Sequence, residues 1–164
     1  MSPFTKSLQI RRAQVENLAE VLRIESVVPE APHWSESAYR DILLQEPEES
    51  TLNRALFVAG DSERIVGFAV AVVVAGQAEL ESIAVDPARR RLGVGKALSD
   101  AVLLWARAAG AREMLLEVRS ANAEARALYG RLGFKETGLR RAYYSSPPDD
   151  AVLMSVSLSN AADL

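Results

Sequence analysis

Apolar residues recur along the chain with two periods, one typical of strands and one typical of helices. Runs of apolar residues, or of apolar residues alternating with polar ones, predict strands at residues 8–12, 55–59, 65–74, 78–85, 113–118, 134–142 and 152–158. Apolar residues spaced three or four apart predict helices at residues 16–27, 36–44, 94–109 and 122–132. Short strands and helices therefore follow one another over almost the whole length.

Residues that favour turns and helix caps separate these elements. Pro29 and Pro32 end the first helix, because proline lacks the backbone donor that a helix needs. Ser35 is placed to cap the second helix, and Gly110 is placed to end the third. Loops or hairpin turns are expected at residues 46–50, 60–63, 76–77 and 145–150.

The order of the elements indicates one α/β domain. Consecutive strands joined by short turns pair antiparallel, whereas strands joined through a helix can pair in parallel. We therefore expect a mixed sheet packed against helices. The single domain spans residues 1–164, with its core at about residues 8–158 and short flexible termini.

Composition narrows the class of protein. Of the 164 residues, 49% are hydrophobic and 25% are charged, which are ordinary values for a globular domain. The net charge of −3 argues against a nucleic-acid-binding protein. Cysteine is absent, which excludes disulfides, thiolate metal sites and a cysteine nucleophile, and fits a reducing compartment. The single histidine, His33, excludes a multi-histidine metal site, and we expect it to lie in a loop.

Nothing in the chain predicts export or membrane insertion. Residues Met1–Gln9 lack the long apolar region of a signal peptide. The longest apolar run, Phe68–Ala75, is far shorter than the ~20 residues that span a bilayer. We therefore expect a soluble, cytoplasmic protein that does not bind membranes.

One segment near the middle of the chain has the layout of a phosphate-binding site. An apolar strand, Ile83–Val85, ends at Asp86–Pro87, and a basic run, Arg89–Arg91, follows it. Gly93 and Gly95 then open a helix. The first N–H groups of a helix have no partners within it, and the helix dipole adds positive potential there. Glycine also lets an anion approach the backbone closely.

This glycine loop differs from two common phosphate loops. A P-loop has four residues between its glycines and then Lys-Ser/Thr, whereas a single residue separates Gly93 from Gly95 and Lys96 precedes Ala97. A dinucleotide fingerprint needs a third glycine, where this chain has Leu98. Without their context, the two glycines would indicate a tight turn and the arginines a solvated face. The strand before the loop and the helix after it favour phosphate binding.

A second group of candidate residues lies further along the chain. Glu117 falls within an apolar strand, where a carboxylate could act as a general base. Alternatively, Glu117 is a solvated strand end paired with Arg119 or Arg126. Asn122 and Tyr129 are about two helical turns apart and project from one face, although Tyr129 could also be an ordinary core residue. The strand end and the helix could flank one cleft at the edge of the sheet.

Together the two segments resemble the GCN5-related N-acetyltransferase (GNAT) superfamily. The matching phrases are I-A-V-D-P-x-x-R-R-x-G-V-G-K-A-L at 83–98 and L-L-E-V-R-S-A-N-A-E-A-R-A-L-Y-G-R-L-G-F at 115–134. The resemblance extends from Gln9 to Leu158. The second phrase, with R-R-A-Y-Y at 140–144, is most similar to the RimI-like branch, which acetylates the N-terminal alanine of a bacterial ribosomal protein. The resemblance implies the GNAT fold, a mostly antiparallel sheet of about seven strands with helices on both faces.

The resemblance also implies roles for particular residues. Acetyl-CoA would be the co-substrate, and no metal would be needed. The pyrophosphate of acetyl-CoA would lie against Arg90, Arg91, Leu92, Gly93, Val94, Gly95 and Lys96, and its pantetheine arm against Ile83, Ala84, Val85 and Asn122. Glu117 would be the general base and Tyr129 the general acid. The groove for the acceptor would be near Trp34, Tyr143 and Tyr144.

One position departs from the RimI-like pattern. RimI-like sequences usually have an apolar residue where this chain has Glu81, and Glu79 lies two residues before it. In histone-type members of the superfamily the base lies on this strand, near Glu79. Glu79 and Glu81 could therefore share or replace the role of Glu117, bind a basic acceptor, or belong to a solvated sheet face.

The acceptor and the partners follow from the same resemblance. It implies acetyl transfer by direct attack on the thioester, with the N-terminus of a ribosomal protein as acceptor and no contact with nucleic acid. The alternatives are a lysine or small-amine acetyltransferase and a non-catalytic acetyl-CoA sensor, although a sensor has no use for Tyr129 or a buried base. We expect a monomer or a weak dimer.

Overall fold

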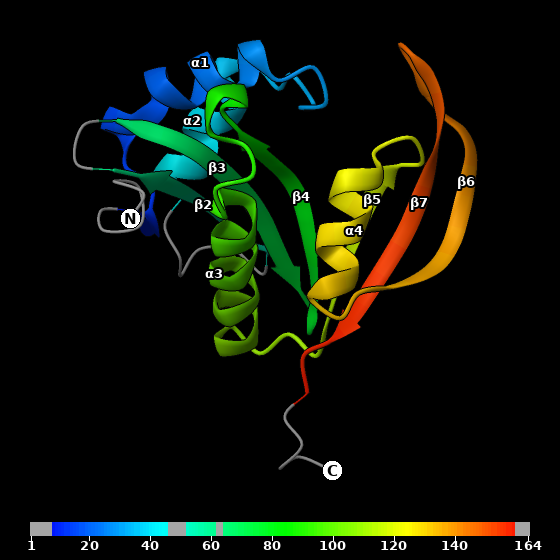
Figure 1. Cartoon of the computed structure of the whole chain (residues 1–164). Helices are drawn as coiled ribbons and strands as arrows, with labels where there is room; N and C mark the ends of the chain where they lie inside the picture. Colours follow the sequence, from blue (N-terminus) through cyan, green and yellow to red (C-terminus); the bar gives the residue numbers. More distant parts are fainter. Residues whose placement is uncertain (1–7, 46–51, 62–63, 160–164) are drawn as a thin grey trace.

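The computed structural model describes residues 8–45, 52–61 and 64–159, and its strands form one continuous sheet (Figure 1). The strands are β1 (Gln9–Arg12), β2 (Leu52–Gly60), β3 (Ile65–Val74), β4 (Gln77–Val85), β5 (Glu113–Arg119), β6 (Lys135–Ser145) and β7 (Pro148–Ser157). They lie in the order β1-β2-β3-β4-β5-β7-β6. All neighbouring strands pair antiparallel except β4 and β5. The expected fold class is confirmed.

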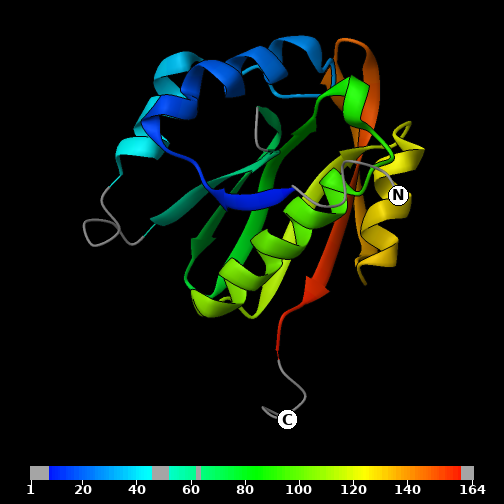
Figure 2. The same cartoon turned by 60° about the vertical axis from the view of Figure 1, so that its left-hand side comes forward.

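Helices cover both faces of this sheet. They are α1 (Leu18–Val27), α2 (Glu36–Leu44), α3 (Val94–Ala108) and α4 (Ala123–Arg131). Figures 1 and 2 together show α1 and α2 on one face and α3 on the other, where α4 packs into the same core. Short 3-10 turns at Val15–Asn17 and Pro87–Arg89 precede α1 and the glycine loop. The predicted cap of α2 is confirmed, because the Ser35 side chain accepts a hydrogen bond from the Ala38 N–H.

Each side of the sheet has its own apolar core. Under α3, the side chains of Leu98, Val102 and Ala106 are fully buried. Burial of a leucine or valine side chain contributes about 1.5–3 kcal/mol. The core under α1 and α2 is built around Ile24, Tyr39 and Phe68. The four-residue spacing from Leu98 places Val102 and Ala106 in this core, whereas Ala108 is exposed.

A β-bulge in β4 changes which face its side chains occupy. Val70 of β3 pairs with Ser82, whereas the next residue, Ala71, pairs with Leu80, so Glu81 is the extra residue. Before the bulge, Leu80 packs into the core under α3. After it, Ala84 packs into the core under α1 and α2. Because of the bulge, the half of β4 before Glu81 buries side chains under α3, and the half after Glu81 buries side chains under α1 and α2.

β4 and β5 are joined over only half of their lengths. Their parallel pairing runs from Gln77 opposite Glu113 to Leu80 opposite Leu116. Beyond Leu80 and Leu116 the two strands diverge, and Figure 1 shows the gap between their ribbons widening toward the end at which α1 and α2 lie. This split is where the sheet positions the candidate site.

Several predicted boundaries need correction. The hairpin between β3 and β4 turns at Ala75–Gly76, so Gln77 belongs to the strand and not to the turn. The expected loop at 145–150 is mostly strand, with its turn at Ser146–Pro147. The loop predicted at 46–50 and part of the turn at 60–63 lie outside the described residues. Among the described residues, no helix is long and apolar enough to cross a membrane.

Candidate active site

A hollow of about 990 Å³ opens at the split between β4 and β5. It is lined by most of the residues that the sequence singled out: Trp34, Glu79, Glu81, Ile83, Ala84, Val85, Arg90, Arg91, Gly93, Val94, Gly95, Lys96, Glu117, Asn122, Tyr129, Tyr143 and Tyr144. Leu92 is not among the lining residues and is 43% exposed. His33 lies in a loop, as expected, and also lines the hollow.

The glycine loop is held at its start by Asp86. The Asp86 carboxylate accepts a hydrogen bond from the Ala88 N–H and lies 3.3 Å from Arg23 of α1. Partial burial raises the pKa of Asp86, but the bonds to Ala88 and Arg23 outweigh it, so the pKa lies below its usual value. The carboxylate is thus ionised at neutral pH and fixes the end of β4.

Gly93 adopts a left-handed conformation, with φ of +83°, where the loop enters α3. A side chain at Gly93 would meet no atom within 4 Å, so the need for glycine is conformational. A Cβ at Gly95 would instead lie 3.3 Å from Leu128 of α4. Gly93 therefore shapes the start of α3, and Gly95 lets α4 approach it closely.

Three cations of the loop each face a carboxylate. Arg90 lies 3.4 Å from Glu30, Lys96 lies 2.8 Å from Asp100, and Arg91 lies 3.9 Å from Glu124. All six side chains are at least 40% exposed, and exposed pairs of this kind contribute little energy. The cations can therefore turn to an anionic ligand at small cost. The first turn of α3 contains no acidic residue that would oppose such a ligand.

Three carboxylates share one face of the sheet at the split. Glu79 pairs with Leu115, and Glu117 lies two residues further along β5 on the same face. Burial raises the pKa of Glu79, as do the nearby charges of Glu81 and Glu117, while Arg140 and Arg54 partly offset this. Glu81 lies 2.8 Å from Arg54.

The alternative in which Glu117 pairs with Arg119 or Arg126 is wrong. Its carboxylate lies 3.3 Å from Arg140 of β6. Arg126 instead pairs with Glu136, and Arg119 stacks on the ring of Tyr144. Sequence reasoning missed Arg54 and Arg140 because both reach the site across an intervening strand. Only their charge signalled a role.

Tyr129 is both a core residue and a wall of the hollow. Its side chain is 4% exposed and packs edge-on against Phe134, with ring centroids 5.7 Å apart. Burial raises the pKa of the Tyr129 hydroxyl, so it stays protonated throughout the physiological range and can donate a proton. Asn122 caps the same helix by accepting a hydrogen bond from the Ala125 N–H at 3.1 Å.

Trp34 is held in place by Glu25, a buried carboxylate that sequence reasoning also missed. The Glu25 Oε1 accepts a hydrogen bond from the backbone N–H of Trp34 at 2.6 Å. The ring centroids of Trp34 and Tyr39 lie 5.6 Å apart. Burial and the neighbouring charge of Glu25 raise the pKa of Tyr39. Glu25 could have been found from the helical period, which places it on the same face as the buried Leu18 and Val21.

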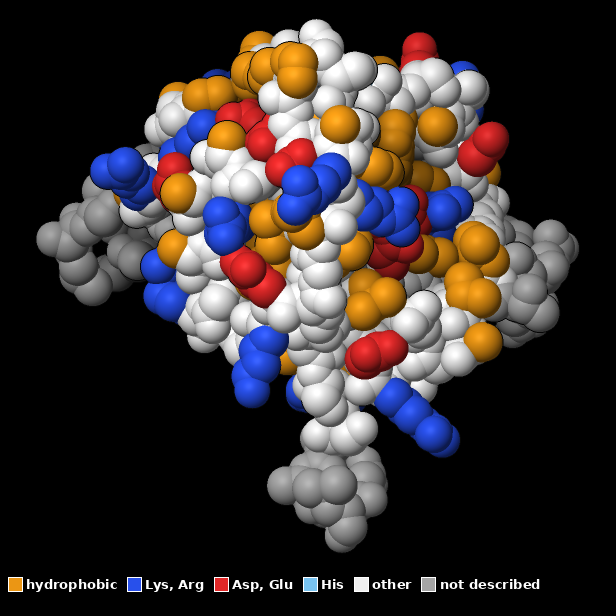
Figure 3. Space-filling model, turned by 90° about the vertical axis from the view of Figure 1, so that its right-hand side faces the viewer, with side chains coloured by type: hydrophobic (Ala, Val, Ile, Leu, Met, Phe, Trp, Pro, Cys, Tyr) orange, Lys and Arg blue, Asp and Glu red, His pale blue; other side chains and the backbone are white. Residues whose placement is uncertain are grey.

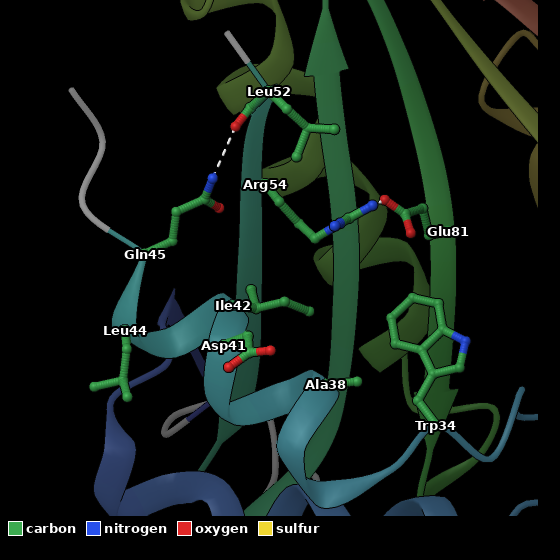
Figure 4. Close-up of a pocket in the computed structure, with 9 residues that line it drawn as sticks. All are labelled: Trp34, Ala38, Asp41, Ile42, Leu44, Gln45, Leu52, Arg54 and Glu81. Atoms are coloured by element: carbon green, nitrogen blue, oxygen red, sulfur yellow. Dashed lines mark hydrogen bonds and ion pairs between the residues drawn. The ribbon is translucent and has the colours of Figure 1, made fainter. Parts of the chain in front are cut away.

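A second hollow, of about 680 Å³, continues from the first along the same sheet face (Figure 4). It lies between α2 and strands β2 and β4, and it shares Trp34 and Glu81 with the first hollow. Figure 4 shows Arg54 reaching across toward Glu81, and Asp41 and Ile42 on α2. The two hollows therefore adjoin at Trp34 and Glu81.

The surface around the site is mixed in charge. On the side that carries β6 and β7, Figure 3 shows acidic side chains set back in a hollow between basic and apolar ones. Tyr143 and Tyr144 form part of the rim, with ring centroids 5.0 Å apart. Within the described part of the chain, no three His, Asp or Glu side chains are grouped to hold a metal ion.

Comparisons with known proteins agree with this arrangement. Residues 17–134 match the acetyltransferase (GNAT) family. The [ribosomal protein bS18]-alanine N-acetyltransferase of Escherichia coli K12 is 37% identical over 128 residues, which cover 77% of this chain and 82% of that protein. The Haemophilus influenzae protein of the same description is 31% identical over 153 residues, covering 92% and 97%. The crystal structure of the E. coli ribosomal-protein-S18-alanine N-acetyltransferase has a TM-score of 0.78 at 32% identity, covering 94% and 96%.

Proposed function

The chain belongs to the acetyltransferase (GNAT) family, and from this premise we propose that it acetylates the N-terminal α-amine of a protein, an alanine on a ribosomal protein. Family membership makes it an acetyl-CoA-dependent N-acetyltransferase. The similarity to bS18-alanine N-acetyltransferases over most of the chain supports this acceptor. The observation that carries the proposal is the hollow itself, which joins the glycine loop, the carboxylate face and Tyr129 at one split in the sheet.

The residues at the hollow fit acetyl-CoA. The left-handed turn at Gly93 directs the start of α3 toward the hollow, where Arg90, Arg91 and Lys96 add positive charge for the diphosphate. Beyond Leu80, the edge of β4 no longer pairs with β5, so residues 81–85 can pair with the amide groups of the pantetheine arm. Asn122, at the N-terminus of α4, lines the same hollow and would hold the pantetheine arm from the side opposite β4.

Catalysis would use direct attack of the amine on the thioester carbon. Glu117 takes the proton from the amine, through a water molecule, as the new N–C bond forms. The Val85 N–H donates to the carbonyl oxygen, where negative charge develops. Tyr129 gives its proton to the sulfur as the C–S bond breaks, and its raised pKa keeps that proton available. Glu79 lies on the same face and could share the role of the base.

The pKa of the acceptor amine determines the free energy that its deprotonation costs. An α-amine has a pKa of ~7.7–8.0, so its deprotonation at pH 7 costs about 1 kcal/mol. A lysine amine, with a pKa of ~10.4, costs roughly 4.6 kcal/mol by the same arithmetic. One mostly buried carboxylate therefore suits an N-terminal amine well.

The experiment is a direct acceptor screen. The protein is mixed with acetyl-CoA and a short peptide that begins with alanine, thiol release is followed, and mass spectrometry locates the acetyl group. We expect turnover with acetyl on the α-amine. Turnover with small amines or lysine alone would show that one of these, and not a protein α-amine, is the acceptor. Tight acetyl-CoA binding without turnover would indicate a sensor.

A further inference from the structure

The candidate base already has a cationic partner within the chain. The Arg140 Nε lies 3.3 Å from the Glu117 Oε1. The Glu117 side chain is 22% exposed and that of Arg140 is 56% exposed. A mostly buried carboxylate is thus covered by a guanidinium that is itself largely in solvent.

The register of the sheet builds this contact. Glu117 pairs with Leu153 of β7, which pairs with Gly138 of β6, so the three residues form one row across the strands. Arg140 lies two residues beyond Gly138, on the same face, and its long side chain reaches back diagonally over β7. Because Gly138 has no side chain, nothing from its own row on β6 stands between the two groups.

An irregularity in β6 just after Arg140 also holds Arg140 in position. Immediately after Arg140 the register of β6 on β7 shifts, and Ala142 takes a left-handed conformation with φ of +53°. The Ala142 N–H donates to the Asp150 Oδ1 at 2.7 Å. The guanidinium carbon of Arg140 lies 5.5 Å from the ring centroid of Tyr143, at the rim of the hollow.

The other arginines of this face are engaged elsewhere. Arg54 from β2 pairs with Glu81 of β4, and Arg119 from β5 stacks on Tyr144 and donates to the Pro147 carbonyl. Arg140 is therefore the cation that is placed against Glu117, where the amine of an acceptor must arrive.

We propose that Arg140 makes the site selective for amines that arrive uncharged, and hence for α-amines over lysine side chains. This inference rests on the proposed function. An ammonium group would be drawn to a free Glu117, but Arg140 occupies that position and repels a second cation. At a pH of about 8.5 an α-amine is mostly neutral, whereas lysine is almost entirely charged. The repulsion therefore acts mainly on lysine.

The test compares two acceptors at about pH 8.5 and low salt. One is a lysine-free peptide that begins with a free alanine, and the other has a blocked N-terminus and one internal lysine. The measured quantity is the ratio of kcat/KM for lysine to kcat/KM for the α-amine. In Arg140→Gln we expect this ratio to rise roughly three- to ten-fold, mainly through a lower KM for the lysine peptide.

Three further variants separate this role from a structural one. Arg140→Met keeps the apolar stem beside Tyr143 and should raise the ratio as Arg140→Gln does. Arg140→Lys keeps a cation and should retain the wild-type ratio, as should Arg141→Gln, which removes an exposed arginine one residue away. An unchanged ratio in both neutral Arg140 variants, or an equal rise in Arg141→Gln, would overturn the inference about Arg140 and leave the proposed function standing. A wild-type protein that acetylates no alanine peptide would overturn the proposed function with it.

Discussion

Leu80 of β4 and Leu116 of β5 are the last residues through which the two parallel strands pair. Both side chains are buried under α3, so the sheet is anchored up to this point and open beyond it. The opening leaves residues 81–85 free along one edge and places Glu117 on the facing strand. One break in strand pairing therefore exposes both the edge proposed to bind the thioester and the carboxylate proposed as the base.

Tyr129 provides the first prediction. Tyr129→Phe removes one oxygen from a packed ring and should lower kcat by about 10²-fold, because the leaving sulfur loses its proton donor. Affinity for acetyl-CoA, measured by calorimetry, should change little, since Phe retains the packing against Phe134. An unchanged kcat would remove Tyr129 from the chemistry.

Glu117 and Glu79 can be ranked by matched substitutions. Glu117→Gln should lower kcat at least 10²-fold, because the attacking amine loses its proton acceptor. Glu79→Gln removes the same charge from the same face and should reduce kcat far less. The measurement is a pH–rate profile for each variant. A larger loss in Glu79→Gln would assign the base to β4.

Gly93 and Gly110 allow a controlled test of the glycine loop. Both have left-handed backbones, with φ of +83° and +90°, and they flank opposite ends of α3. Alanine at either position should lower stability by about 1–2 kcal/mol, or a few degrees in Tm. Only Gly93→Ala should also weaken acetyl-CoA binding, by roughly ten-fold. Equal affinities in the two variants would place the diphosphate elsewhere.

Glu79 should make stability depend on pH. Its pKa is raised in the folded state, so the folded protein binds this proton more tightly than the unfolded chain does. The resulting stabilisation is complete below the unfolded pKa of ~4.3 and is lost as the pH rises through the higher folded value. Glu79→Gln should therefore raise Tm at pH 7, by at most about 2 °C for so exposed a group, and leave it unchanged near pH 4. Calorimetry at both pH values measures this, and a lower Tm at pH 7 would contradict it.

Local patterns were sufficient for most of the fold. The strand at 65–74 and the helix at 36–44 have the predicted bounds, because an uninterrupted apolar run and a serine cap followed by helical spacing are decided by neighbouring residues. The break at Asp86–Pro87 and the glycine that opens α3 were also visible in the sequence. The extent of β6 and β7 was not, because β6 is almost wholly exposed and shows no apolar alternation.

The chain alone determined which chemistry was available: no thiol, one histidine, a basic glycine loop, and a carboxylate and a tyrosine on neighbouring elements. Tertiary structure decided how these groups meet. The bulge at Glu81, the separation of β4 from β5 after Leu80, and the ion pairs Arg54–Glu81 and Arg140–Glu117 all depend on strand register. Register is fixed by packing among residues far apart in sequence, and a shift of one residue turns every side chain to the other face.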